Sequence, residues 1–128
     1  MASFDKADIE KLIDGVLPWP ATQDMLKSSK DEDRFDKYVE IMQARVEFDD
    51  PILLPLTPQL FIVSSGGQRI VKCRCGHSFG DYRVNWKLSA LIHVRDDEQK
   101  MSEVYVGREM PDPPWLQLRE YICEGCGT

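Results

Sequence analysis

The four cysteines of this 128-residue sequence fall in two pairs, and a glycine directly follows each pair. Cys73 and Cys75 have one residue between them, whereas Cys123 and Cys126 have two. Thiolates paired in this way bind one metal ion from a tight turn, and the glycine can adopt the positive φ that such a turn needs. Because four thiolates form a common structural shell for tetrahedral zinc, we predict one zinc ion bound by Cys73, Cys75, Cys123 and Cys126.

Two histidines are alternative ligands. His77 follows Cys75 by two residues and could replace one thiolate. We favour a position beside the turn for His77, because four thiolates already complete the shell. His93 falls on the polar side of an alternating segment and is expected at the surface. A complete shell leaves no place for water or substrate, so the zinc is expected to be structural rather than catalytic. Inert thiols, iron and redox-labile cysteine pairs remain open as alternatives.

Residues 76–122 separate the two pairs, which is more than the roughly 15–20 residues of a compact zinc ribbon. Apolar and polar residues alternate from Trp86 to Val94, and this pattern predicts a strand. A second strand is expected over Glu103–Val106, after a charged turn at 96–100. The long spacing is therefore explained by a strand pair inserted between the two cysteine pairs.

The first third of the sequence has the periodicity of helices. Apolar residues from Ile9 to Leu17 recur at helical spacing, and Pro18 ends that segment. Ser29 begins a capping-box pattern, so a further helix is expected from about Ser29 to Val46. A short helical turn is expected between the two, at 21–26, after a stiff corner at Trp19-Pro20.

The remaining segments predict antiparallel strands. Leu60–Val63 and Arg69–Cys73 flank a turn with two glycines and form an expected hairpin that carries the first cysteine pair. Residues 51–58 contain three prolines and are expected to be an extended apolar connector, either covered by a partner or part of the core. A proline-rich linker precedes a final strand over Leu116–Cys123, which carries the second pair.

These elements predict an α+β fold. Residues 1–50 form an N-terminal helical arm, and residues 51–128 form an antiparallel, β-rich, zinc-ribbon-like domain with an inserted strand pair. The sequence has no apolar run near the roughly 20 residues that cross a bilayer. Its first residues lack the basic and apolar regions of a signal peptide. We therefore expect a cytoplasmic protein, in which cysteines are reduced or bound to metal.

The charge balance argues against nucleic acid and anionic membranes as partners. There are 16 basic and 22 acidic residues, with a formal net charge of −6. A stand-alone zinc ribbon that binds nucleic acid or a transcription partner is the second hypothesis, and its basic residues would be Arg69, Lys72, Arg74 and Arg83. A small redox or metal-catalytic protein is the third. The sequence shows neither a phosphate-binding glycine loop nor a nucleophile elbow.

Several stretches beyond the cysteines carry a family resemblance. They are Asp33–Tyr38, Asp49–Pro55, Cys73–His77, Gly80–Arg83, Asn85–Leu88, and Leu118–Tyr121 leading into Cys123–Gly127. Together they resemble the small zinc-binding subunit of ATP-dependent ketone carboxylases, a family that includes the acetone carboxylase gamma subunit and the acetophenone carboxylase small subunit. Acetone carboxylase gamma subunits usually continue past the last cysteine pair, so an ending at Thr128 favours the acetophenone type.

The resemblance implies a function for the assembled complex and a limited role for this chain. The complex would be a carbon–carbon bond-forming ligase that carboxylates a ketone with bicarbonate and ATP. Nucleotide and ketone chemistry would belong to large hydantoinase-like subunits. This chain would be a non-catalytic member of a hetero-oligomer that binds zinc, holds no ATP itself, and bridges the large subunits.

Overall fold

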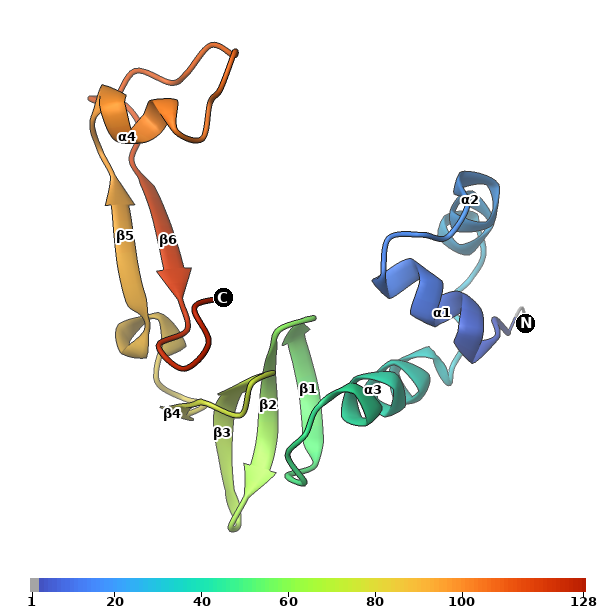
Figure 1. Ribbon diagram of the computed structural model, residues 1–128. Coiled ribbons are helices and arrows are strands. Elements are labelled where there is room, and N and C mark those ends of the chain that lie inside the picture. The colour runs from blue at the N-terminus through green and yellow to red at the C-terminus, as the bar shows by residue number, and fades with distance from the viewer. Residues whose placement is uncertain (1–2) are drawn as a thin grey trace.

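The computed structural model describes residues 3–128 and contains helices followed by two antiparallel sheets (Figure 1). The N-terminal helices are α1 (Lys6–Ile13), α2 (Trp19–Lys27) and α3 (Arg34–Arg45). The first sheet has the order β1 (Ile52–Thr57), β2 (Leu60–Ser65), β3 (Gln68–Cys73) and β4 (Ser78–Asp81). The second part comprises the 3-10 helix η1 (Trp86–Ser89), β5 (Leu91–Arg95), α4 (Glu98–Ser102) and β6 (Leu118–Ile122). The predicted α+β class, with helices before an antiparallel zinc-ribbon-like region, is confirmed.

The four-stranded sheet has apolar residues on both faces because β2 alternates between them. Phe61 and Val63 are fully buried and pack with Met42 of α3 and with Ile52 of β1. Leu60 points to the other face and packs with Val71, Cys73, Phe79 and Cys123. One face of the sheet is therefore covered by α3, and the other face is covered by the residues around the cysteines.

The α1–α2 region begins and ends its helices differently from the prediction. α1 stops at Ile13 instead of continuing to Leu17, because Gly15 takes φ +73° and reverses the chain just after the helix. The backbone N–H groups of Val16 and Leu17 then donate to the Lys11 carbonyl. α2 already begins at Trp19, because proline is tolerated in the first helical turn.

The predicted capping box at Ser29 is not formed. α3 begins at Arg34, after the buried Asp31 accepts a 2.6 Å bond from the Arg34 Nε atom. The carboxylate of Asp31 therefore holds the start of the helix from the preceding loop.

Residues 51–58 are extended as expected, but they form strand β1 rather than a free connector. β1 pairs with β2 in antiparallel fashion, with irregular register on both sides of Leu54 and Pro55. Proline is compatible with this place because β1 is an edge strand. Ile52 belongs to the core, whereas Leu53, Leu54 and Leu56 are about 40% exposed (40%, 41% and 42%).

The segment between the cysteine pairs differs most from the prediction. Trp86–Val94 is not one strand: the Asn85 side chain caps η1, and only Leu91 onward is extended. The predicted strand at 103–106 is wrong, since these residues form turns after α4, and β5 pairs with β6 instead. β4 was not predicted, and the expected charged turn at 96–100 contains the start of α4.

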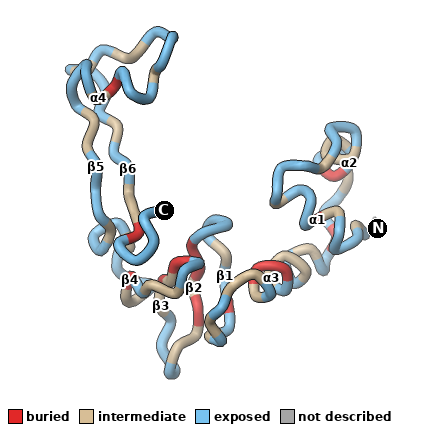
Figure 2. Tube along the Cα trace, viewed as in Figure 1, coloured by how far each residue is buried: buried red, intermediate tan, exposed pale blue. Residues whose placement is uncertain are grey.

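Buried residues concentrate in the four-stranded sheet and the helices, whereas the β5–β6 region is mostly exposed (Figure 2). Across residues 3–128, no helix has both the length and the apolar character needed to cross a bilayer.

Candidate metal centre

The structure brings the four predicted cysteines together from two distant places in the chain. Cys73 ends β3 and Cys75 lies in the turn that follows, while Cys123 and Cys126 follow β6. All four Sγ atoms lie within 4.8 Å of one another. The Cys73–Cys126 and Cys75–Cys123 pairs are each 3.7 Å apart.

These distances suit a metal and not a disulfide. A tetrahedron with metal–sulfur bonds of about 2.3 Å has sulfur–sulfur edges of about 3.8 Å. A disulfide bond is about 2.05 Å long, and all four cysteines are free. The donor set and its spacing therefore fit one tetrahedral ion such as zinc, with every ligand position taken by sulfur.

The two cysteine turns, which we call knuckle 1 (Cys73–His77) and knuckle 2 (Cys123–Thr128), close in the same way despite their different spacing. The Gly76 N–H donates to the Cys73 carbonyl at 2.8 Å, and the Gly127 N–H donates to the Cys123 carbonyl at 2.8 Å. Both glycines have positive φ, +95° and +76°, as predicted. The one-residue difference between the pairs is absorbed inside the turn, so the shorter spacing still presents two sulfurs to one point.

Further backbone bonds fix the first cysteine of each knuckle. The Cys73 N–H donates to the His77 carbonyl at 2.9 Å, and the Cys123 N–H donates to the Thr128 carbonyl at 2.7 Å. The His77 N–H points to the Cys75 sulfur at 3.4 Å, a bond that favours a thiolate there.

The four sulfurs divide into a buried and an exposed pair. Cys73 and Cys123 are 2% and 4% exposed and belong to the sheet core, whereas Cys75 and Cys126 are exposed. Burial raises the pKa of Cys73 to about 12 and also raises that of Cys75. Hydrogen bonds with Thr128 lower the pKa of Cys126 to about 6. A metal entering this site must therefore displace a proton from the Cys73 thiol, while the Cys126 thiol ionises readily.

His77 lies beside the site and outside the sulfur cluster. Its ring packs edge-on against Phe79, with centroids 5.2 Å apart. Its side chain also touches knuckle 2 at Gly125, where an added Cβ would come within 2.8 Å of the His77 Cβ. Sequence reasoning missed this role of Gly125, because a residue inside a CxxC spacing gives no signal of what packs on it.

A row of aromatic rings connects the two halves of the site. Phe79 contacts Trp86 at 5.8 Å, and Trp86 contacts Tyr121 at 6.0 Å, both edge to face. Lys87 covers the free side of the Tyr121 ring at 4.8 Å. Edge-to-face pairs of this kind are favourable at centroid distances of about 4.5–7 Å. The row therefore holds β6, and with it knuckle 2, against the four-stranded sheet.

The exposed sulfurs border a hollow of about 420 Å³ that reaches the helices. Its lining is polar and consists of Arg45, Glu47, Gln59, Arg74, Cys75 and Cys126. The Arg45 guanidinium binds both carboxylate oxygens of Asp14, at 2.7 and 3.1 Å. The end of α3 and the candidate metal centre thus border one hollow, and Arg45 ties the end of α1 to its rim.

The basic residues considered for nucleic-acid binding mostly have other partners. Lys72 forms an ion pair with Asp50 and lies over the Phe48 ring. Arg83 pairs with Asp81, and Arg69 lies over the Tyr82 ring. His93 is exposed on β5, opposite Glu120. A free basic face of the kind that contacts phosphates is therefore not assembled from these four residues.

Comparison with known proteins gives a consistent family. The family model described as acetone carboxylase gamma subunit matches residues 46–128, which include the four-stranded sheet, both knuckles and the β5–β6 region. The acetone carboxylase gamma subunit of Xanthobacter autotrophicus (strain ATCC BAA-1158 / Py2) is 46% identical over 128 residues. The similarity covers 98% of this chain and 76% of that protein, so it extends over the helices as well. On this evidence, the chain belongs to the acetone carboxylase gamma subunit family.

Proposed function

We propose that this chain is the small, non-catalytic, zinc-binding subunit of a cytoplasmic, ATP-dependent ketone carboxylase. In this role it bridges large hydantoinase-like subunits that carry the nucleotide and the ketone. The observation that carries the proposal is the complete four-sulfur cluster on a chain that is 46% identical to an acetone carboxylase gamma subunit.

The proposed metal is zinc, with Cys73, Cys75, Cys123 and Cys126 as its ligands. The 3.7 Å sulfur separations and the all-thiol donor set support this assignment. Bound zinc would supply a fixed crosslink between β3 and the end of β6. Because four thiolates occupy the whole coordination shell, no position is left for water or substrate. The chain's own residues therefore hold two parts of the subunit together and take no chemical step.

The proposed bridging role draws support from the extended shape of the chain. We infer two units, a helical arm at residues 1–50 and a β-rich domain at residues 51–128. In Figure 1, helices α1 and α2 and the β5–β6 strand pair extend in different directions from the four-stranded sheet. Large apolar side chains are exposed at both ends, including Leu26 at 72% in α2 and Trp115 at 88% beyond α4. Exposed apolar groups at two separated ends suit contacts with two large neighbours.

The ketone is proposed to be acetone, in keeping with the name of the relative from Xanthobacter autotrophicus. Acetophenone is the alternative. Carboxylation assays of the purified complex with each ketone, bicarbonate and ATP distinguish the two.

The decisive experiment is purification of the native complex through an affinity tag on this chain. We expect large subunits to co-purify, one zinc per copy of this chain, and ketone-dependent ATP hydrolysis only in the complex. ATP hydrolysis by the isolated chain, or a metal-free complex of full activity, would contradict the proposal.

A further inference from the structure

The β5–β6 hairpin has no second layer of structure over most of its length. We use "hairpin arm" for residues 91–122. β5 pairs only with β6 among residues 3–128, over five residue pairs. An isolated two-stranded ribbon is marginally stable in water, since it has no covered apolar face. In Figure 1 the arm extends away from the four-stranded sheet, so the sheet does not provide that cover.

Apolar side chains are exposed along the ribbon. Leu91 and Ile92 are 53% and 51% exposed, and as neighbours in a strand they point to opposite faces. Within the arm, only Met101 is buried. Strands β5 and β6 are tan or pale blue in Figure 2. Both faces of the ribbon therefore carry apolar side chains that residues 3–128 leave about half exposed.

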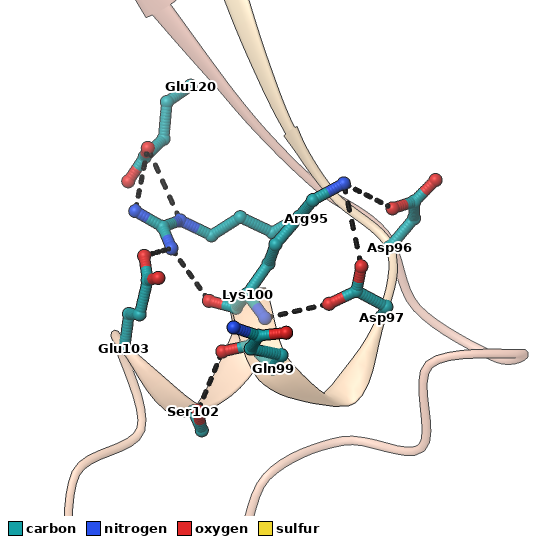
Figure 3. A network of polar contacts seen from close by, with 8 residues as sticks. All are labelled: Arg95, Asp96, Asp97, Gln99, Lys100, Ser102, Glu103 and Glu120. Atoms are coloured by element: carbon teal, nitrogen blue, oxygen red, sulfur yellow. Dashed lines mark hydrogen bonds and ion pairs between the residues drawn. The ribbon is translucent and has the colours of Figure 1, made fainter.

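The far end of the arm is nevertheless held in a defined shape by ion pairs (Figure 3). The Arg95 guanidinium donates to the Lys100 carbonyl at 2.6 Å and to Glu103 at 2.8 Å, and it pairs with Glu120 of β6 at 3.3 Å. The Arg95 side chain is only 12% exposed. This network joins β5, α4 and β6 at a point far from the main core.

The turn that begins α4 adds a second set of bonds. Asp97 caps the helix by accepting from the Lys100 N–H at 2.7 Å, and the Lys100 ammonium pairs with Asp96 at 3.3 Å. Met101 of α4 is completely buried. Residues 96–116, which we call the tip, thus have a small ordered centre of their own.

This ordered tip displays large apolar groups to solvent. Val106 is 75% exposed and Trp115 is 88% exposed, with Val104 and Leu116 at 47% and 40%. A tryptophan that is almost fully exposed is typical of an anchor that fills a pocket on a partner. The tip is therefore built to present these groups rather than to bury them within the chain.

The charge around these groups indicates what kind of surface covers them. Residues 96–112 contain six acidic side chains and two basic ones. Lys100 is already paired with Asp96 and Asp97. A second copy of this chain would bring the same acidic tip into contact with itself, and like charges at an interface are unfavourable. A complementary partner has basic groups around an apolar groove.

We propose that the hairpin arm is a docking element that inserts into an apolar groove, rimmed by lysine or arginine side chains, on a large subunit of the carboxylase. Trp115 and Val106 anchor the tip, and the acidic residues of 96–112 contact the rim. This inference rests on the proposed function, since it names the part of the chain by which the subunit binds its neighbour.

Hydrogen exchange on the tagged native complex tests the proposal directly. The amides of β5 and β6 should exchange rapidly in the isolated zinc-loaded chain and become protected in the complex, while those of β2 and β3 are protected in both. If large subunits co-purify but the arm exchanges equally fast in both samples, the docking proposal is wrong while the proposed function stands. Failure of any large subunit to co-purify would instead contradict the proposed function.

A matched pair of substitutions tests the anchors. Val106→Asp places a charge in the proposed groove and should weaken binding of the purified chain to the large subunits at least about tenfold. Val84→Asp is the control, because Val84 is also an exposed valine, at 51%, but lies outside the arm. Zinc content and circular dichroism should be unchanged in both. Equal affinities of the two variants would overturn the proposal.

Sedimentation of the isolated chain tests the alternative occupant. We expect a monomer at micromolar concentration. A dimer that Val106→Asp dissociates would assign the tip to a second copy and contradict the assignment to a large subunit.

Discussion

The four-stranded sheet and the hairpin arm are both antiparallel, but only the sheet is packed on two sides. Phe61 and Val63 lie against α3, and Leu60 lies against the residues around the cysteines. The arm buries only Met101. The two cysteine pairs connect these unequal regions, since Cys73 ends a strand of the sheet and Cys123 follows a strand of the arm. In this chain, the candidate metal centre lies where a region with almost no core meets a region that has one.

Loss of one sulfur ligand should have the largest effect of the changes considered, because it removes the proposed link between the sheet and the hairpin arm. Cys126→Ser removes an exposed thiolate without creating a cavity in the core. Zinc binding to four-ligand sites stabilises small domains on the order of 10 kcal/mol, so we expect loss of metal and rapid exchange throughout β6. Elemental analysis and hydrogen exchange check this result. His77→Gln is the control and should retain one zinc; loss of zinc there would make His77 a ligand.

Removal of a core ring should affect the sheet instead. Phe61→Ala empties a fully buried site between α3 and the sheet. Such truncations cost about 3–5 kcal/mol of unfolding free energy. Denaturant unfolding of the zinc-loaded chain measures the loss. Met101→Ala is the comparison, since Met101 is equally buried but lies in the arm; a global loss as large as that of Phe61→Ala would show that the arm and the sheet unfold together.

Crowding the contact between the two knuckles should reduce zinc affinity and stability by an intermediate amount. Gly125→Ala places a Cβ 2.8 Å from the His77 Cβ and 3.3 Å from the Cys75 sulfur. We expect weaker zinc binding and a loss of about 1–3 kcal/mol, the usual range for overpacking. Competition with a chelator measures the zinc affinity. Adding His77→Gly to this variant should restore part of it, and no recovery would mean that the collision with His77 is not the cause.

Loosening the tip should leave the sheet unaffected. Arg95→Met keeps the unbranched stem of the side chain as far as the position of Nε but removes its bonds to Glu103, Glu120 and the Lys100 carbonyl. We expect several-fold faster amide exchange in α4 without a change in zinc content or in the midpoint of global unfolding. A lowered global midpoint would show that the network supports more than the arm.

The smallest effect is expected from an ion pair at the edge of the sheet. Hydrogen bonds from Arg83 lower the pKa of Asp81 to about 2, below its ordinary value of 3.8. The pair therefore stabilises the fold above about pH 4, and this contribution is lost as the pH falls toward 2. Carboxyl titration followed by NMR should give the low midpoint, and Arg83→Gln should raise it. A titration midpoint near 3.8 for Asp81 in the unsubstituted chain would show that the Asp81–Arg83 pair does not contribute to stability.

Local patterns predicted much of the fold because they depend on residues close in sequence. The helical periodicity of α1 and α3, the two-glycine turn between β2 and β3, and both cysteine knuckles are visible in the sequence and present in the structure. The predicted secondary structure was wrong where contacts between residues far apart in the sequence determine the backbone conformation. Apolar alternation continued across η1, although the Asn85 cap and the packing of Trp86 on Phe79 and Tyr121 make that segment turn.

Local sequence patterns also did not predict which strands pair with each other. β1 reads as a proline-rich connector, yet it pairs with β2 at the edge of the sheet. β5 pairs with β6, so the chain between them forms α4 and the tip rather than a return strand. Strand pairing depends on long-range hydrogen bonds, and short apolar segments do not specify them.

The choice of four cysteines as candidate ligands and the form of the two turns that present them follow from residue types alone. Cysteine is the only thiol, and glycine after each pair permits the positive φ that closes the turn. Three features depend on the tertiary structure. They are the burial of Cys73 and Cys123, the close packing of Gly125 against His77, and the position of the second knuckle at the end of an uncovered arm. These features depend on what packs from elsewhere in the chain, and periodicity or spacing carries no record of such contacts.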